Sequence, residues 1–103
     1  MKKAKRNRLE AAGWRVGAVD EFLGLSPEET AYIEMKLALA RRLRALRLAR
    51  ELTQHELAKM LGSSQSRVAR MESADTSVTV DAILRALFAL GDTREKLAKA
   101  LCA

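Results

Sequence analysis

The chain has few of the residues that form covalent or metal cross-links in small proteins. Its 103 residues include one cysteine, Cys102, and one histidine, His55. A single cysteine excludes a disulfide within the chain and is typical of proteins in a reducing compartment. With one histidine and one cysteine there is no metal cluster of the usual spacing and no catalytic dyad. We therefore expect no metal, no cofactor and no enzymatic activity.

Proline, aromatic residues and long apolar runs are also scarce. One proline, five glycines and few β-branched residues favour an all-helical fold. Half of the residues are hydrophobic but only four are aromatic, so the core must consist mainly of leucine and alanine. No apolar run approaches the roughly 18 residues of a membrane span, and no apolar signal region follows the basic N-terminus. These absences predict a cytoplasmic location.

Charge is abundant and unevenly distributed. Residues 1–8 carry five positive charges, whereas residues 9–35 carry six acids against one arginine. Residues 36–70 carry nine positive side chains against two acids, and the remainder is nearly neutral. A basic region of this kind either binds a polyanion or only solvates helix surfaces. Charge alone does not decide between these two interpretations.

Residues 52–73 hold the clearest structural pattern. Thr53 and Glu56 have the spacing of a capping box, which predicts a short helix over Gln54–Leu61. Three apolar residues share one side of this helix, namely Leu57, Ala58 and Leu61. Gly62 follows, and glycine readily adopts the left-handed conformation that ends a helix.

A second short helix follows the glycine. Either Ser63 or Ser64 caps it, and its apolar side consists of Val68 and Met71. Two helices joined by so short a turn must cross steeply. The pattern therefore predicts a helix-turn-helix unit.

A long helix precedes this unit. Ser26 and Glu29 form a capping box with Pro27 at the first helical position, and nothing interrupts the helix until about Arg50. Its main apolar stripe should face the helix-turn-helix and comprises Tyr32, Met35, Leu39, Leu43 and Leu46. A second apolar side comprises Ile33, Leu37 and Leu48, and we expect it to be buried as well. Either Trp14 and Phe22 cover that side, or it forms an interface.

Two more helices follow. Thr79 or Ser77 caps a helix that continues to Leu90, and its apolar set is Val80, Ile83, Leu84, Leu87 and Phe88. Gly91 ends it, and Thr93 caps a last helix over Arg94–Leu101. We therefore predict a compact all-α bundle of about five helices, in which residues 26–103 form the domain. Residues 1–25 precede it as a basic arm and a short acidic, aromatic extension.

The residues of the central unit resemble the helix-turn-helix family of phage repressors and Xre-like regulators. That family has glutamine opening the first helix, Leu-Ala in its middle and glycine at the turn, which match Gln54, Leu57–Ala58 and Gly62. The resemblance covers about Arg41 to Gly91 and implies a lambda-repressor-like fold. Ser63 departs from it, since many members place an apolar residue there.

The resemblance implies that the chain binds double-stranded DNA through its second short helix. Family positions place Gln65, Ser66 and Arg70 against base edges in the major groove. These residue types suit direct readout, because glutamine pairs with adenine and arginine with guanine. Three further residues match phosphate-contacting positions, namely Gln54, Ser64 and Arg67. The competing interpretation is that these are ordinary surface residues.

Two other matched residues imply architecture. In the family, the residues at the positions of Arg47 and Glu72 form a partly buried ion pair that ties the first helix to the recognition helix. We expect the same pair here. Because one recognition helix reads only a few base pairs, we also expect a homodimer on a near-palindromic operator. Leu97 with Leu101, or the side of Ile33 and Leu37, is the candidate dimer surface.

The segment before the domain, together with the chain's C-terminal sequence, resembles small antitoxins of the HigA type. That likeness implies an autoregulating repressor that neutralises a ribonuclease toxin of the RelE/HigB type. An acidic segment with apolar anchors would suit a basic toxin surface, and the candidate partner-binding residues are Trp14, Val16, Phe22 and Leu23. As a DNA-binding protein it would be associated with the nucleoid. The alternatives are a free-standing phage-type or housekeeping repressor with no protein partner and an adaptor whose helix-turn-helix binds only protein.

Overall fold

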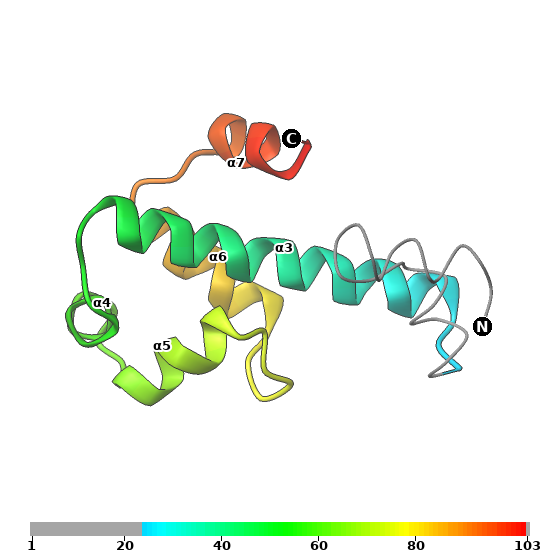
Figure 1. The fold of residues 1–103 in the computed structure, drawn as a ribbon, viewed down its shortest axis with the longest axis horizontal. Helices are drawn as coiled ribbons and strands as arrows, with labels where there is room; N and C mark the ends of the chain where they lie inside the picture. Colours follow the sequence, from blue (N-terminus) through cyan, green and yellow to red (C-terminus); the bar gives the residue numbers. More distant parts are fainter. Residues whose placement is uncertain (1–23, 103) are drawn as a thin grey trace. The chain divides into compact units, whose positions relative to one another are not determined.

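The computed structural model describes residues 24–102, which form five α-helices and contain no strand (Figure 1). The helices are α3 (Pro27–Ala49), α4 (Gln54–Leu61), α5 (Gln65–Glu72), α6 (Val80–Ala89) and α7 (Arg94–Cys102). This confirms the predicted all-α class. Within the described residues, 24–35 and 36–102 belong to two separate compact units.

The first part contains the start of α3. Ser26 N donates to Glu29 Oε1 over 2.9 Å, and Glu29 N donates to Ser26 Oγ over 3.1 Å. This is the predicted capping box, and the bonds from Ser26 hold the pKa of Glu29 below its ordinary value. From this cap α3 runs for 23 residues, which corresponds to about 34 Å of helix.

The second part holds the core. Its buried apolar residues come from all five helices, the loop before α6 and Leu90 directly after α6, and nine of the thirteen are leucine or alanine. The seven largest fully buried side chains are Leu43, Leu57, Val68, Val78, Ile83, Leu87 and Leu90. None of the described aromatic residues belongs to this core. The expectation of a core made of leucine and alanine is therefore confirmed for the described residues.

The predicted apolar stripe of α3 is only half correct. Leu39 and Leu43 are buried and Leu46 packs against the core, but Tyr32 and Met35 are exposed. Helical periodicity shows which residues share a side, but it does not show where along the helix the packing neighbours begin. In the described structure, the buried apolar residues of α3 begin at Leu39.

The second apolar side of α3 is exposed at Ile33, Leu37 and Leu48, so the described residues do not bury it. Its cover by Trp14 and Phe22, or by an interface, stays a prediction.

The expected burial of Phe88 is wrong. Phe88 of α6 is exposed, whereas Ala86, which was not among the residues expected to be buried, is buried. At 100° per residue, Phe88 lies about 100° beyond Leu87 and outside the buried side of α6.

The later helices begin at the predicted residues. Thr79, not Ser77, caps α6 by accepting a hydrogen bond from Ala82 N, and Ser77 lies in the preceding loop, where its N donates to Asp75 Oδ1. Thr93 Oγ1 accepts from Lys96 N at the start of α7, and Gly91 has a left-handed φ of 93° between the two helices. Helix α7 ends at Cys102, one residue later than predicted.

Candidate nucleic-acid interface

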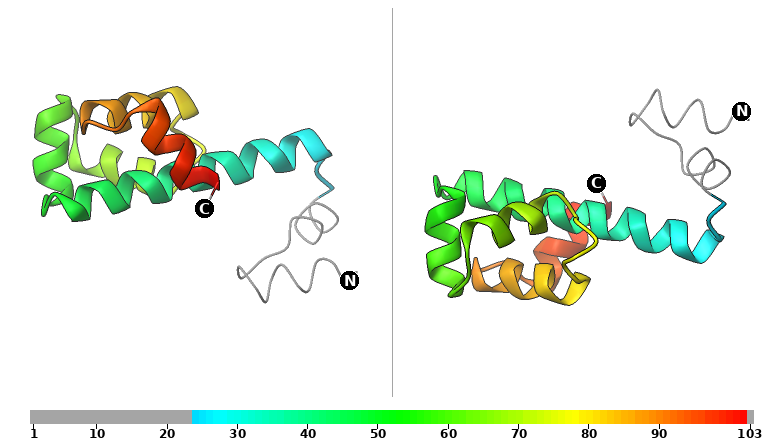
Figure 2. Two further views of the ribbon diagram at one scale, coloured as in Figure 1. Left: turned by 90° about the horizontal axis from the view of Figure 1, so that it is seen from above. Right: turned by 90° about the horizontal axis from the view of Figure 1, so that it is seen from below.

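The turn between α4 and α5 follows from local sequence. Thr53 caps α4 with a complete capping box, and Gly62 ends it with a φ of 66°. Ser63 N then donates to Ala58 O over 2.8 Å, and Ser64 Oγ accepts from Arg67 N at the start of α5. A turn of three residues forces α4 and α5 to cross steeply (Figures 1 and 2). The predicted helix-turn-helix geometry is therefore present.

One side of α5 packs on the core and the other is exposed. Val68 and Met71 are buried, whereas Gln65, Ser66 and Arg70 are exposed. Arg67 is half-buried at the edge between these sides. The three candidate base-contacting residues thus share the free side of the helix.

A chain of hydrogen bonds connects this free side to the first helix of the domain. Gln65 Nε2 donates to Gln54 Oε1 over 2.7 Å, and Gln54 Nε2 donates to Glu72 Oε1 over 3.1 Å. Gln54 is half-buried. Both ends of its amide are therefore engaged, and this fixes its orientation and that of the neighbouring Gln65 amide. The sequence pattern identified Gln54 only as a phosphate-contacting position and gave no sign of this bridging role.

The chain of bonds ends at an ion pair. Arg47 Nε lies 2.6 Å from Glu72 Oε2, and Arg47 Nη2 donates to Glu72 Oε1 over 3.1 Å. A third bond runs from Arg47 Nη1 to Leu52 O over 2.8 Å. The two side chains are 9% and 5% exposed, so the pair is buried and bidentate. It joins α3 to the end of α5.

Not all positive charge in residues 36–70 is available to a polyanion. Lys36 is buried and its Nζ donates to Asp75 O over 2.9 Å. Arg42 forms a bidentate ion pair with Asp92, at 2.9 and 3.1 Å, and this pair holds the pKa of Asp92 below its ordinary value. With Arg47, these residues hold the described bundle together. Six cationic side chains remain exposed or half-buried, namely Arg41, Arg44, Arg50, Lys59, Arg67 and Arg70.

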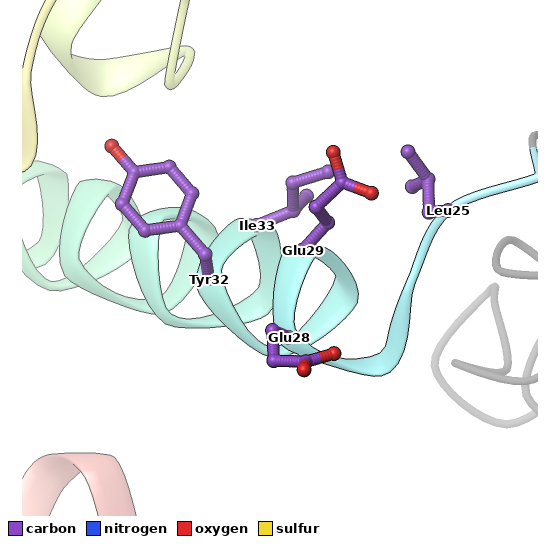
Figure 3. Close-up of a pocket in the computed structure, with 5 residues that line it drawn as sticks. All are labelled: Leu25, Glu28, Glu29, Tyr32 and Ile33. Atoms are coloured by element: carbon purple, nitrogen blue, oxygen red, sulfur yellow. The ribbon is translucent and has the colours of Figure 1, made fainter.

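The candidate partner-binding residues Trp14, Val16, Phe22 and Leu23 lie outside the described residues. Next to them in sequence, an open hollow of about 300 Å³ is lined by Leu25, Glu28, Glu29, Tyr32 and Ile33 (Figure 3). Apolar side chains thus lie beside two carboxylates. This combination continues the acidic, apolar character of the preceding sequence.

No other kind of site is evident in residues 24–102. They contain no group of three or more histidine, cysteine or acidic side chains that could hold a metal ion. Among the same residues, none of the helices combines the length and the apolar character needed to span a bilayer.

Comparison with known proteins identifies the domain type. A family model described as a helix-turn-helix domain matches residues 38–100, which include the C-terminal half of α3, all of α4, α5 and α6, and most of α7. The match is consistent with the Xre-like resemblance and contains all of its residues. Searches of curated proteins and of solved structures found no match.

Proposed function

Because the chain belongs to the helix-turn-helix domain family, we propose that it is a transcriptional repressor that reads double-stranded DNA with α5. The observation that carries this proposal is the free side of α5, where Gln65, Ser66 and Arg70 are exposed together. The family match supports a DNA-binding regulator.

In this proposal the N-terminal half of α5 enters the major groove. Gln65 gives one of its two amide hydrogens to Gln54 and keeps the other, together with its free carbonyl oxygen. A donor and an acceptor at this spacing fit adenine N7 and N6, and Arg70 fits guanine O6 and N7. Because the bond to Gln54 already orients the Gln65 amide, less rotational freedom is lost on binding.

Phosphate contacts would fix the register of α5 in the groove. Gln54 keeps one amide hydrogen after donating to Glu72, and the start of α4 favours an anion. Ser64 and Arg67 are candidates at the start of α5, where Arg67 would add a positive charge. These contacts carry no sequence information, so their loss should weaken binding to every sequence alike.

Binding to an operator selected from random DNA tests the proposal, with fluorescence anisotropy at fixed salt as the readout. Arg70→Ala should cost about 1–3 kcal/mol and relax the preference at one position of the site. Arg67→Ala, which removes a phosphate contact only, should weaken all sequences alike. Gln54→Ala should weaken all sequences and also relax the preference at the position read by Gln65, whose amide Gln54 orients. Arg85→Ala is the control, because Arg85 is exposed on α6 and pairs with Asp81. If operator affinity does not respond to Gln65→Ala or Arg70→Ala, α5 is not the recognition helix.

We further propose that the repressor is the antitoxin of a toxin-antitoxin pair, neutralises a RelE/HigB-type ribonuclease and represses its own operon. Besides the resemblance, support comes from residues 9–35, whose six acids surround several apolar residues. In the described part of this segment, Tyr32 and Met35 are exposed and Glu28 and Glu29 border the hollow. A ribonuclease must hold RNA phosphates on a basic surface, which an acidic segment with apolar anchors would complement.

The product of the neighbouring gene tests the antitoxin proposal. The full chain should bind a small basic protein encoded there, and a chain that begins at Ser26 should lose this binding while it keeps operator binding. If the shortened chain still binds, the contact lies on α3 or on the C-terminal helices. If the full chain binds no such protein, the chain is a free-standing repressor. If the full chain binds the partner protein but binds no DNA, the chain is an adaptor.

A further inference from the structure

We propose that Asp75 is a positioning residue for Arg70 and so determines how strictly the chain selects the base that Arg70 contacts. Asp75 lies in the loop between α5 and α6, after the helix-turn-helix unit. It is not among the residues that the sequence pattern matched to DNA contacts. The proposal rests on the proposed DNA-binding function, because it assigns a specificity determinant to the same recognition helix.

The chain after α5 folds back onto the last turn of that helix. Asp75 N donates to Arg70 O over 2.9 Å, and Ser73 Oγ donates to the same carbonyl oxygen over 3.1 Å. Between them, Ala74 has a left-handed φ of 55°, which helps the chain to reverse its direction. The backbone of Asp75 is therefore tied directly to the backbone of Arg70.

A second set of contacts fixes Asp75 from the other side. Lys36 of α3 is only 8% exposed, and its Nζ donates to Asp75 O over 2.9 Å. Ser77 N donates to Asp75 Oδ1 over 2.8 Å, so the carboxylate is held as well as the backbone. A carboxylate accepts about four hydrogen bonds, so this one keeps capacity for a further donor. The fold thus places the Asp75 side chain before DNA binds.

The carboxylate of Asp75 and the guanidinium of Arg70 attract each other. Hydrogen bonds from Ser77 hold the pKa of Asp75 below its ordinary value, and the positive charges of Arg70 and Lys36 lower it further. Of these two charges, that of Arg70 has the larger effect. Arg70 forms no ion pair within residues 24–102. The attraction therefore restricts the direction of the Arg70 side chain without occupying its hydrogen-bonding edge.

This attraction has two effects on DNA binding. An arginine side chain loses rotational freedom when it binds a base edge, and a side chain already drawn in one direction loses less. A carboxylate beside the groove also repels the phosphates of any sequence. A guanine that binds Arg70 offsets this repulsion, whereas another base does not. Asp75 should therefore lower the affinity for DNA in general and lower it least where guanine occupies this position.

Binding of four full-length chains to the selected operator, and to operators changed at single base pairs, tests the role of Asp75. The chains are the wild type, Asp75→Asn, Arg70→Ala and the double variant, with fluorescence anisotropy at fixed salt as the readout. Asp75→Asn should reduce the preference at the base pair read by Arg70 about tenfold, a typical coupling between neighbouring residues. It should also raise the affinity for unrelated DNA. The base preferences of the double variant should equal those of Arg70→Ala alone.

Asp81→Asn is the matched control, because it removes the same charge from a largely exposed position on α6. It should leave every base preference unchanged, which separates the positioning of Arg70 from a change in net charge. In Asp75→Asn the amide oxygen can still accept from Ser77 N, so the loop should keep its structure. Thermal unfolding followed by circular dichroism checks that this variant is folded.

A titration without DNA tests the pairing itself. The pKa of the Asp75 carboxyl, followed by NMR in the free chain, should rise in Arg70→Ala, because the positive charge that favours the ionised carboxylate is removed. Arg85→Ala removes an exposed arginine that pairs with Asp81, so it should leave the pKa of Asp75 unchanged. An unchanged pKa in Arg70→Ala would overturn the proposal.

The DNA measurements separate failure of this proposal from failure of the proposed function. If Arg70→Ala relaxes one base pair and Asp75→Asn leaves that preference unchanged, Asp75 does not position Arg70, and the proposed DNA-binding function stands. If Asp75→Asn relaxes a different base pair, Asp75 reads that pair itself, because a carboxylate can accept from cytosine N4. If the wild-type chain distinguishes no base pair, the proposed function fails and the role of Asp75 fails with it.

Discussion

Removing the carboxylate of Glu72 should destabilise the domain far more than removing an exposed acid. In the wild type, Glu72 accepts two hydrogen bonds from Arg47 and one from Gln54. Glu72→Ala would leave the Arg47 guanidinium buried, with Leu52 O as its remaining bond. An unpaired buried charge of this kind costs about 3–5 kcal/mol. For a domain of this size that corresponds to a fall in melting temperature of at least about 12 °C.

Thermal unfolding followed by circular dichroism measures this effect, and Asp81→Ala is the control. Asp81 also forms an ion pair, with Arg85, but both partners are largely exposed. Such a pair at i,i+4 spacing contributes only about 0.5 kcal/mol. Glu72→Gln should fall between the two variants, because it removes the charge but keeps the shape and one acceptor. Equal melting temperatures for Glu72→Ala and Asp81→Ala would refute the buried ion pair as a source of stability.

Other predictions concern local interactions that hold the bundle together. The lowered pKa of Asp92 means that its pairing with Arg42 stabilises the fold above the unfolded carboxyl pKa and is lost as pH falls through the folded value. Asp92→Asn should therefore reduce the loss of stability on acidification below about pH 4, as measured by denaturant titrations at several pH values. Gly62→Ala should cost about 1 kcal/mol in the same titration, because alanine disfavours the left-handed φ although space is free around it. Thr53→Ala should cost about 1 kcal/mol through loss of the α4 cap, and Thr53→Ser should restore most of it. Equal unfolding free energies for Thr53→Ala and the wild type would contradict that role.

The local features of the fold could be predicted from sequence because each depends on residues a few positions apart. The capping residues Ser26, Thr53 and Thr79 and the helix stop at Gly62 are of this kind. The all-α class follows from the same signals. In these cases the side chain and the backbone group that it binds are close in sequence, so tertiary packing is not needed to bring them together.

Features that depend on distant residues could not be predicted from spacing alone. Arg42 and Asp92 are fifty positions apart, and neither is among the matched residues that pointed to the pair of Arg47 and Glu72. For the same reason, the spacing did not show that Lys36 and Arg42 bind groups within the bundle and are therefore not available to DNA. The exposure of Tyr32 and Met35 shows the same limit, because periodicity predicts direction but not the extent of packing.

Within the candidate site, the sequence predicted which residues could contact DNA, but it did not predict the hydrogen bonds that orient their side chains. The resemblance pointed to Gln54 and Gln65 as separate contacts to phosphate and base. In the structure they are joined by a 2.7 Å hydrogen bond and linked onward to Glu72. Orientation of an amide by its neighbours is a tertiary property, and no sequence pattern considered above reports it.

Selection of binding sites from a random DNA library tests the central claim most directly. We predict an enriched near-palindromic sequence with two half-sites spaced by about one helical turn, roughly 10 bp. Repeating the selection with Arg70→Ala should relax one position in each half-site and leave the others unchanged. Failure to enrich any sequence would contradict the claim that α5 reads DNA. Enrichment of the same sequence at the same stringency by the Arg70→Ala chain would contradict the role of Arg70.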